Sequence, residues 1–153
     1  MEAPGKGYLF ETDEHHALRE QIRRFAANEI APHAHAWEEA NEFPRELYQT
    51  AAKAGFLGIG YPEELGGNGG DLTHVLVASE EMVLAGKSVG TLVGLGSLGI
   101  AIPPIVKFGT DEQKERFVRP ALTGEKVSAL GITEPGGGSA VAAVRTKAVR
   151  DGD

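Results

Sequence analysis

Apolar residues recur every three or four positions in the first part of the chain, which is the period of an amphipathic helix. Thr12 or Asp13 can cap the first turn, because their side-chain oxygens accept backbone N–H groups. Pro32 ends or bends the helix, since proline has no N–H to donate. The pattern therefore predicts a helix with one apolar face, formed by Leu18, Ile22, Phe25, Ala26 and Ile30.

Three further segments show the same period and have their own start and stop signals. The residues that mark their ends are Pro44 and Gly55, Asp71 and Gly86, and Thr110 and Gly124. Proline suits a first helical turn, aspartate and threonine cap one, and glycine accepts the left-handed conformation that often follows a last turn. Thr110 and Gln113 have the spacing of a capping box. These signals predict an all-α domain.

Residues 88–106 contain no charged side chain, and this length is close to that of a membrane span. Four glycines and the pair Pro103 and Pro104 reduce its apolar content, which favours a buried helix and no membrane span. Small residues lie along this predicted helix, so either a neighbouring helix or a thin acyl chain could approach its backbone. They are Gly90, Gly94, Ser97 and Ala101.

The pattern changes after residue 125. Residues 127–132 form a short apolar run typical of a strand, and in residues 144–149 valine and threonine alternate with charged residues, which also indicates a strand. We therefore expect a mainly α chain with three parts: a flexible lead at residues 1–11, an all-α domain at 12–125, and the beginning of a β domain at 126–153.

Charge, cysteine content and the N-terminus limit the possible functions. The net charge of −7 argues against nucleic acid as a partner, and the chain has no cysteine for a disulfide or a thiolate metal site. The first residues lack the apolar core of a secretion signal, so we expect a cytoplasmic protein. His33 and His35 are two positions apart and would face different sides of a helix, so no metal site is predicted.

The segment SALGITEPGGGSA, residues 128–140, has the chemistry of a ligand-binding loop. Gly136, Gly137 and Gly138 place no side chain between a ligand and the backbone, so their N–H groups can converge on an anion such as pyrophosphate. Thr133 and Ser139 add a hydroxyl on each side. Taken alone, the three glycines would also suit a plain flexible turn.

The sequence TEPGGGS after an apolar run resembles the signature of the acyl-CoA dehydrogenase family. The order of the helices, the loop PEELGGNGG and the segment KFGTDEQKERFVRPALTGE are also similar, so the resemblance covers the chain from about Thr12 onward. It implies the N-terminal helical domain of that fold, followed by a β domain, in an α+β full-length protein. It also implies that FAD is the cofactor.

The resemblance further implies a set of binding residues. The carbonyl of Leu130 and Thr133 would meet the pyrimidine edge of the flavin, with Ile132 between them, and Gly138 and Ser139 would meet the pyrophosphate. Ser139 would also lie beside the pantetheine of an acyl-CoA substrate. The chain departs from the family at Leu130, where an aromatic residue is common, and at position 140, where Ala140 replaces the usual aspartate.

The implied reaction is α,β-desaturation of an acyl-CoA thioester in fatty acid metabolism, by a homo-oligomer that passes electrons to an electron-transfer flavoprotein. The family's base is a glutamate in a C-terminal helical domain outside these residues, so the catalytic residue is unknown and the chain alone should be inactive. Two alternatives stay open: a non-catalytic helical binding or assembly module, and another flavoenzyme of the same fold, such as an acyl-CoA oxidase or a flavin monooxygenase.

Overall fold

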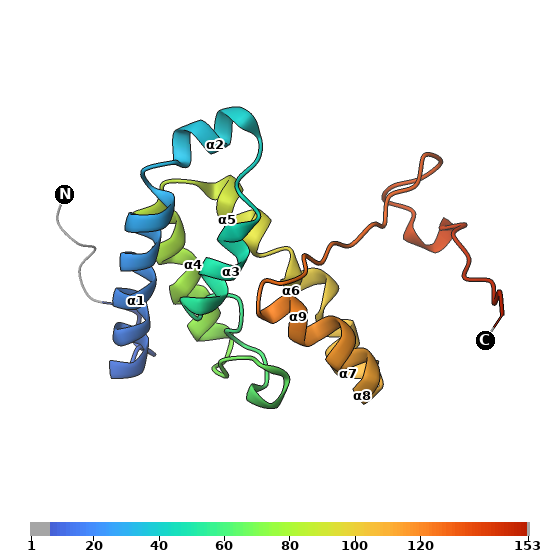
Figure 1. The fold of residues 1–153 in the computed structure, drawn as a ribbon, viewed down its shortest axis with the longest axis horizontal. Coiled ribbons are helices and arrows are strands. Elements are labelled where there is room, and N and C mark those ends of the chain that lie inside the picture. Colours follow the sequence, from blue (N-terminus) through green and yellow to red (C-terminus); the bar gives the residue numbers. More distant parts are fainter. Residues whose placement is uncertain (1–6, 153) are drawn as a thin grey trace.

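The computed structural model describes residues 7–152, which form a helical body and an extended C-terminal segment (Figure 1). The α-helices of the body are α1 (Asp13–Phe25), α2 (Ala34–Ala40), α3 (Glu46–Lys53), α4 (Leu72–Gly86), α5 (Val89–Leu95), α6 (Leu98–Ala101), α7 (Pro103–Phe108), α8 (Asp111–Gln113) and α9 (Arg119–Leu122). The prediction of a mainly α chain is confirmed. The body accounts for most of the described chain.

The core forms where α1 packs along α4, with α3, α5 and α9 closing around this pair. The predicted apolar face of α1 points inward, since Ile22 is 0% exposed, and Val77 and Met82 of α4 are equally enclosed. After Phe25 the first helix widens into a π-helical turn, Ala26–Ile30, before the chain reaches α2. Burial of these side chains is the main stabilising term of the body.

Side chains cap the helices at the predicted positions. Asp71 accepts the N–H groups of Thr73 and His74 at the start of α4, and the hydroxyl of Thr110 accepts the N–H of Gln113 at the start of α8. Thr12 forms a capping box with His15 at the start of α1. These bonds satisfy N–H groups that a helix cannot satisfy internally.

Residues 88–106 do not form the single buried helix that their composition predicts. The stretch is divided into α5, α6 and α7, because glycines occur at the first break and Pro103 and Pro104 cannot donate N–H groups at the second. Val93 is 67% exposed and Ile100 is 63% exposed. By length and composition alone, Val89–Phe108 is the one stretch within residues 7–152 that could cross a membrane, which is weak evidence for a span.

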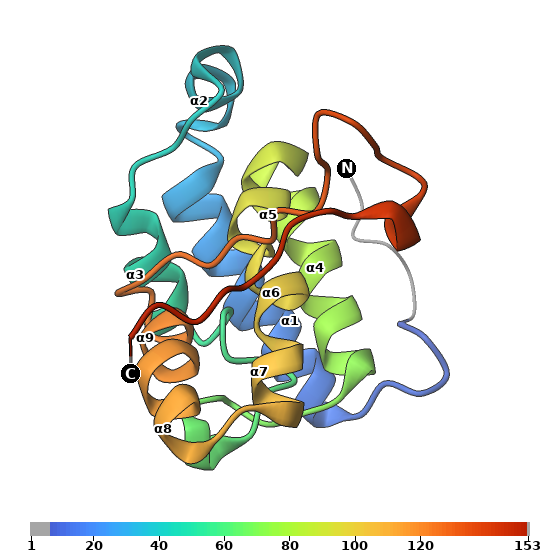
Figure 2. The same cartoon turned by 90° about the vertical axis from the view of Figure 1, so that its right-hand side faces the viewer.

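The predicted strands at 127–132 and 144–149 are absent, and residues 7–152 contain no β-strand. A strand needs a hydrogen-bonded neighbour, and these segments run beside no partner strand in the described chain. The segment instead leaves the helical body in extended form (Figures 1 and 2). Its first residues are tethered to the body, because Ser97 donates a 3.0 Å hydrogen bond from Oγ to the carbonyl of Ser128.

Candidate functional site

The glycine loop, residues 133–139, begins with a tight turn. Glu134 and Gly137 exchange two backbone hydrogen bonds, each 3.1 Å long, which reverse the chain direction around Pro135 and Gly136. A short 3₁₀ turn, Val141–Ala143, follows the loop. The sequence-predicted turn residues thus form a compact hairpin in an otherwise extended segment.

The glycine loop leaves backbone donors open. The N–H groups of Gly136, Gly138 and Ser139 have no hydrogen-bond acceptor among residues 7–152. A Cβ atom built on Gly136, Gly137 or Gly138 would meet no atom within 4 Å, so the approach to this backbone is unobstructed. Open N–H donors without side-chain cover suit an anionic group, and a pyrophosphate fits this chemistry.

The carboxylate of Glu134 is bound by the chain beyond the 3₁₀ turn. It accepts the backbone N–H of Arg145 at 2.9 Å and that of Thr146 at 2.7 Å, and the Thr146 hydroxyl donates to it as well. These donors, with the Thr146 hydroxyl as the largest cause, lower the pKa of Glu134 below its ordinary value. No sequence pattern predicts this contact, because the partners are separated by eleven and twelve positions.

The other predicted site residues lie on the same segment. Leu130 is 51% exposed and Ile132 is 47% exposed, in the extended stretch that leads to Thr133. Gly138 and Ser139 are exposed at the end of the loop. The structure therefore presents all five on one continuous exposed segment, to the right of α6 and α9 in Figure 1.

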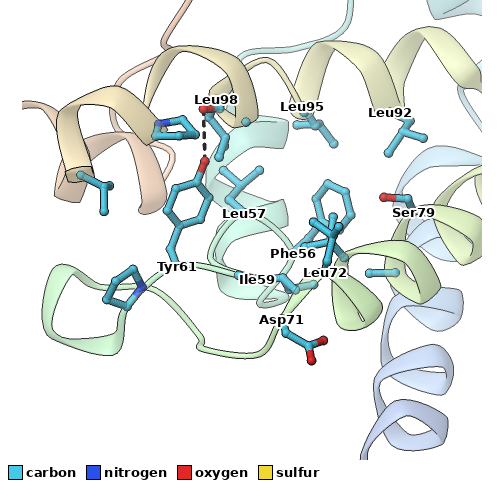
Figure 3. A pocket seen from close by; sticks show the side chains of 18 residues that line it. Phe56, Leu57, Ile59, Tyr61, Asp71, Leu72, Ser79, Leu92, Leu95 and Leu98 are labelled. Carbon is cyan, nitrogen blue, oxygen red and sulfur yellow. Dashed lines mark hydrogen bonds between the residues drawn. The ribbon is translucent and has the colours of Figure 1, made fainter. Parts of the chain in front are cut away.

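The helical body contains an apolar cavity of about 540 Å³ (Figure 3). Its walls come from α4, from the α5–α6 region and from the loop that contains Phe56 and Tyr61. Tyr61 donates a 3.2 Å hydrogen bond from its hydroxyl to the carbonyl of Leu98, and burial raises the pKa of this phenol. The side chains that surround the cavity include Phe56, Leu57, Ile59, Leu72, Val75, Leu92, Leu95 and Leu98.

The small residues predicted to admit a neighbouring helix or an acyl chain, Gly90, Gly94, Ser97 and Ala101, do not line this cavity. Gly94 packs against Phe43 and Gly90 against Glu38, so these two positions serve contacts within the protein. Gly96 and Gly99, which are not among those four residues, line the apolar cavity. A Cβ atom on Gly99 would meet nothing within 4 Å, because it would point into open space.

Within residues 7–152, one group of side chains that could bind a metal occurs, away from His33 and His35. Donor atoms of His15, Asp71 and His74 lie within 4.8 Å of one another where α1 and α4 begin. Both nitrogens of His15 already meet threonine hydroxyls, and Asp71 caps α4. Helix N-termini disfavour a cation, so capping explains this group. His33 stacks on Trp37, and His35 lies near Glu39 on the surface.

The comparisons with known proteins agree with this architecture. Residues 12–125 match the family description "Acyl-CoA dehydrogenase, N-terminal domain". The chain belongs to the acyl-CoA dehydrogenase family. It is 40% identical over 141 residues to the mitochondrial long-chain specific acyl-CoA dehydrogenase of Mus musculus, which covers 92% of this chain and 32% of the mouse protein.

Two solved acyl-CoA dehydrogenase structures support the fold. One, of a probable acyl-CoA dehydrogenase from Mycobacterium abscessus, is 47% identical with a TM-score of 0.88 and covers 93% of this chain and 38% of its own. Another, an acyl-CoA dehydrogenase from Bacillus anthracis complexed with FAD, is 34% identical with a TM-score of 0.78 and covers 88% of this chain and 23% of its own. The chain thus spans about a third of the curated relatives that it matches.

Proposed function

We propose that the chain is the amino-terminal part of an FAD-dependent acyl-CoA dehydrogenase that introduces an α,β double bond into an acyl-CoA thioester. The observation that carries this proposal is the order of two features: a helical domain matched over residues 12–125, then the glycine loop. When bound, FAD would supply the hydride acceptor for the β carbon of the substrate.

Five residues of the extended segment would hold the cofactor. The carbonyl of Leu130 and the side chain of Thr133 would meet the pyrimidine edge of the flavin, together with Ile132. Gly138 and Ser139 would direct their open N–H groups at the pyrophosphate, and the Ser139 hydroxyl would add a further donor. Ser139 would also contact the pantetheine of acyl-CoA. The unobstructed backbone of the loop supports this assignment.

Glu134 does not serve as the base of the proposed reaction. A base must have a free lone pair directed at the substrate proton, whereas this carboxylate accepts bonds from Arg145 and Thr146. These bonds also lower its pKa, which weakens it as a proton acceptor. We therefore expect no turnover from the chain alone, and no residue within it is assigned as the catalytic base.

The apolar cavity is the proposed place for the acyl chain. Its lining is mainly apolar, and the polar side chains that line it are those of Asp71, Ser79 and the hydrogen-bonded Tyr61. An acyl chain gains about 0.8 kcal/mol for each methylene that it buries, so such a wall favours an alkyl substrate. Gly96 and Gly99 keep one side of the cavity open.

The remaining parts of the proposal concern the setting of the enzyme. We propose a cytoplasmic homo-oligomer that takes part in fatty acid metabolism and passes its electrons to an electron-transfer flavoprotein. The net charge of −7 and the absence of cysteine are compatible with this setting.

FAD binding tests the cofactor assignment. Fluorescence titration of the intact enzyme should give a finite dissociation constant for FAD, which Thr133→Ala raises about two- to tenfold and Ser139→Ala raises further, because its partner is charged. Thr123→Ala, on the exposed end of α9, is the control and should change nothing. Equal constants for all four proteins, or no binding at all, would reject the assignment. Oxygen consumption by the intact enzyme with acyl-CoA would indicate an oxidase.

A further inference from the structure

Glu134 closes the polypeptide around the glycine loop. Its carboxylate, at the start of the loop, accepts hydrogen bonds from the successive backbone N–H groups of Arg145 and Thr146, and from the Thr146 hydroxyl. We call this contact the carboxylate clasp. It brings together the two ends of a segment that contains the glycine loop and the 3₁₀ turn Val141–Ala143.

The surroundings make this contact important for the shape of the loop. Residues 126–152 contain no strand, and the residues from Gly136 to Arg145 are exposed. Closing a flexible segment of this length costs conformational entropy, which packing usually offsets. Here the hydrogen bonds to an ionised carboxylate take that role, because charge-assisted bonds are about twice as strong as neutral ones.

We infer that Glu134 is a positioning residue: its carboxylate clasp sets the shape of the glycine loop before any ligand binds, and so prepares the loop for a pyrophosphate. This inference rests on the proposed function of the loop as the FAD site. The clasp pairs the N–H groups of Arg145 and Thr146, whereas those of Gly138 and Ser139 have no acceptor within the described chain.

The clasp depends on the charge of Glu134. The Glu134 carboxylate lies in a small surface pocket, and the one other ionisable side chain that lines this pocket is that of Arg145. The remaining lining residues are Pro135, Gly136, Ala143 and Thr146. The 3₁₀ turn packed beside them carries only valine and alanine. The lowered pKa of Glu134 keeps the clasp intact as the pH falls through the ordinary glutamate range, and protonation then releases it.

NMR spectroscopy of the 153-residue chain tests the clasp without a cofactor. In the wild type, the amide resonances of Arg145 and Thr146 should shift with pH together, with a midpoint below the ordinary value for glutamate. In Glu134→Gln this titration should disappear, and both amides should exchange faster with solvent. Glu125→Gln removes the same charge from an exposed position near the start of the segment, and it should retain the titration.

FAD titration of the intact enzyme, as the wild type and with each of the same two substitutions, tests the consequence. We expect Glu134→Gln to weaken FAD binding about tenfold and Glu125→Gln to leave it unchanged. Identical amide titrations in the wild type and Glu134→Gln, or equal FAD affinities, would overturn the inference. If the wild type binds no FAD, the proposed function of the loop fails, and the amide titration still decides whether the clasp sets its shape.

Discussion

The Arg23 guanidinium on α1 donates two parallel hydrogen bonds, each 2.9 Å long, to the carboxylate of Glu81 on α4. The Glu81 side chain is only 3% exposed, and Arg19, one turn earlier on α1, donates a third bond to it at 3.1 Å. Arg19 also binds Glu11 and Glu80. This network joins the two central helices, α1 and α4, and fixes their position relative to each other. It lies away from the glycine loop, so its effects on stability can be measured separately from cofactor binding.

Glu81→Ala should lower the free energy of unfolding by about 3 kcal/mol, at the lower end of the cost of breaking a buried ion pair. The lower end applies because Arg23 is 47% exposed and Arg19 keeps its other partners. Urea unfolding followed by circular dichroism measures this change. Glu20→Ala, on the exposed face of α1, should change the stability by no more than about 0.5 kcal/mol. Equal effects of the two substitutions would contradict the role of the network.

The stability of the chain should fall as the pH drops from about 4.5 to about 2. The Arg19 guanidinium beside Glu11 is the main cause that lowers the pKa of this carboxyl from 4.5 to about 2. A carboxyl with a lowered pKa in the folded state stabilises the fold above its unfolded pKa, and this contribution is lost as the pH falls toward the folded pKa. The urea concentration at the unfolding midpoint should therefore decrease less steeply with falling pH in Glu11→Gln than in the wild type. Glu42→Gln, which removes an exposed carboxylate, should decline in parallel with the wild type.

Gly124→Ala should destabilise the helical domain by more than about 2 kcal/mol. Gly124 has a φ of +73°, and a Cβ atom there would lie 2.4 Å from the carbonyl carbon of Tyr48. Both the backbone conformation and the close approach of α9 to α3 therefore require glycine. Thermal unfolding measures the loss. Gly131→Ala is the matched control, since its Cβ would meet nothing within 4 Å, and a similar loss there would refute the explanation.

The sequence predicted the helical body well because its signals are local. Asp71 and Thr110 cap helices at the expected positions, and each needs only residues two or three positions away. The predicted stop at Gly86 differs in detail, because Lys87 takes the left-handed conformation with a φ of 58°. Gly86 instead lets α4 approach the π-helical turn, since its Cβ would lie 3.3 Å from Ile30. This requirement for glycine comes from tertiary packing, and the local sequence pattern does not encode it.

The candidate site was predicted only in part for the same reason. The composition of the glycine loop pointed to an anion, and its residues do leave open N–H groups. The bond between Glu134 and Thr146 spans twelve positions, and no periodicity encodes it. The strand expected at residues 127–132 is absent because an apolar run describes the preference of single residues, whereas a strand also needs a hydrogen-bonded partner.

Gly99→Leu should fill the apolar cavity and raise stability by about 1 kcal/mol, because glycine is a poor helix former and this position in α6 has open space. If the cavity receives the acyl chain, the same change should weaken palmitoyl-CoA binding about tenfold by displacing roughly two methylenes. Isothermal titration calorimetry measures the affinity. Ile100→Leu, on the exposed side of α6, is the control. Unchanged affinity in Gly99→Leu would assign the cavity to packing against another part of a longer protein.

Ala140→Asp should tighten FAD binding by ordering the end of the glycine loop. Ala140 is the N-cap of the 3₁₀ turn Val141–Ala143, and it offers no side-chain acceptor to that turn. Aspartate, the residue common at this place in the family, would accept the free N–H groups of the turn, and such a cap is worth about 1 kcal/mol. That gain corresponds to an affinity about fivefold higher, if the turn must form before FAD binds.

An opposing effect determines how this prediction is tested. A carboxylate directed at the pyrophosphate would repel it by about 1 kcal/mol at 4 Å in water, and by more in a less polar site. Salt screens that repulsion but has little effect on a short capping bond. FAD titrations of the wild type, Ala140→Asp and Ala140→Asn at low and high salt separate the two effects, because asparagine caps without a charge. We expect both variants to bind FAD more tightly at either salt concentration. A salt-sensitive loss of affinity in Ala140→Asp alone would show that the side chain faces the phosphates.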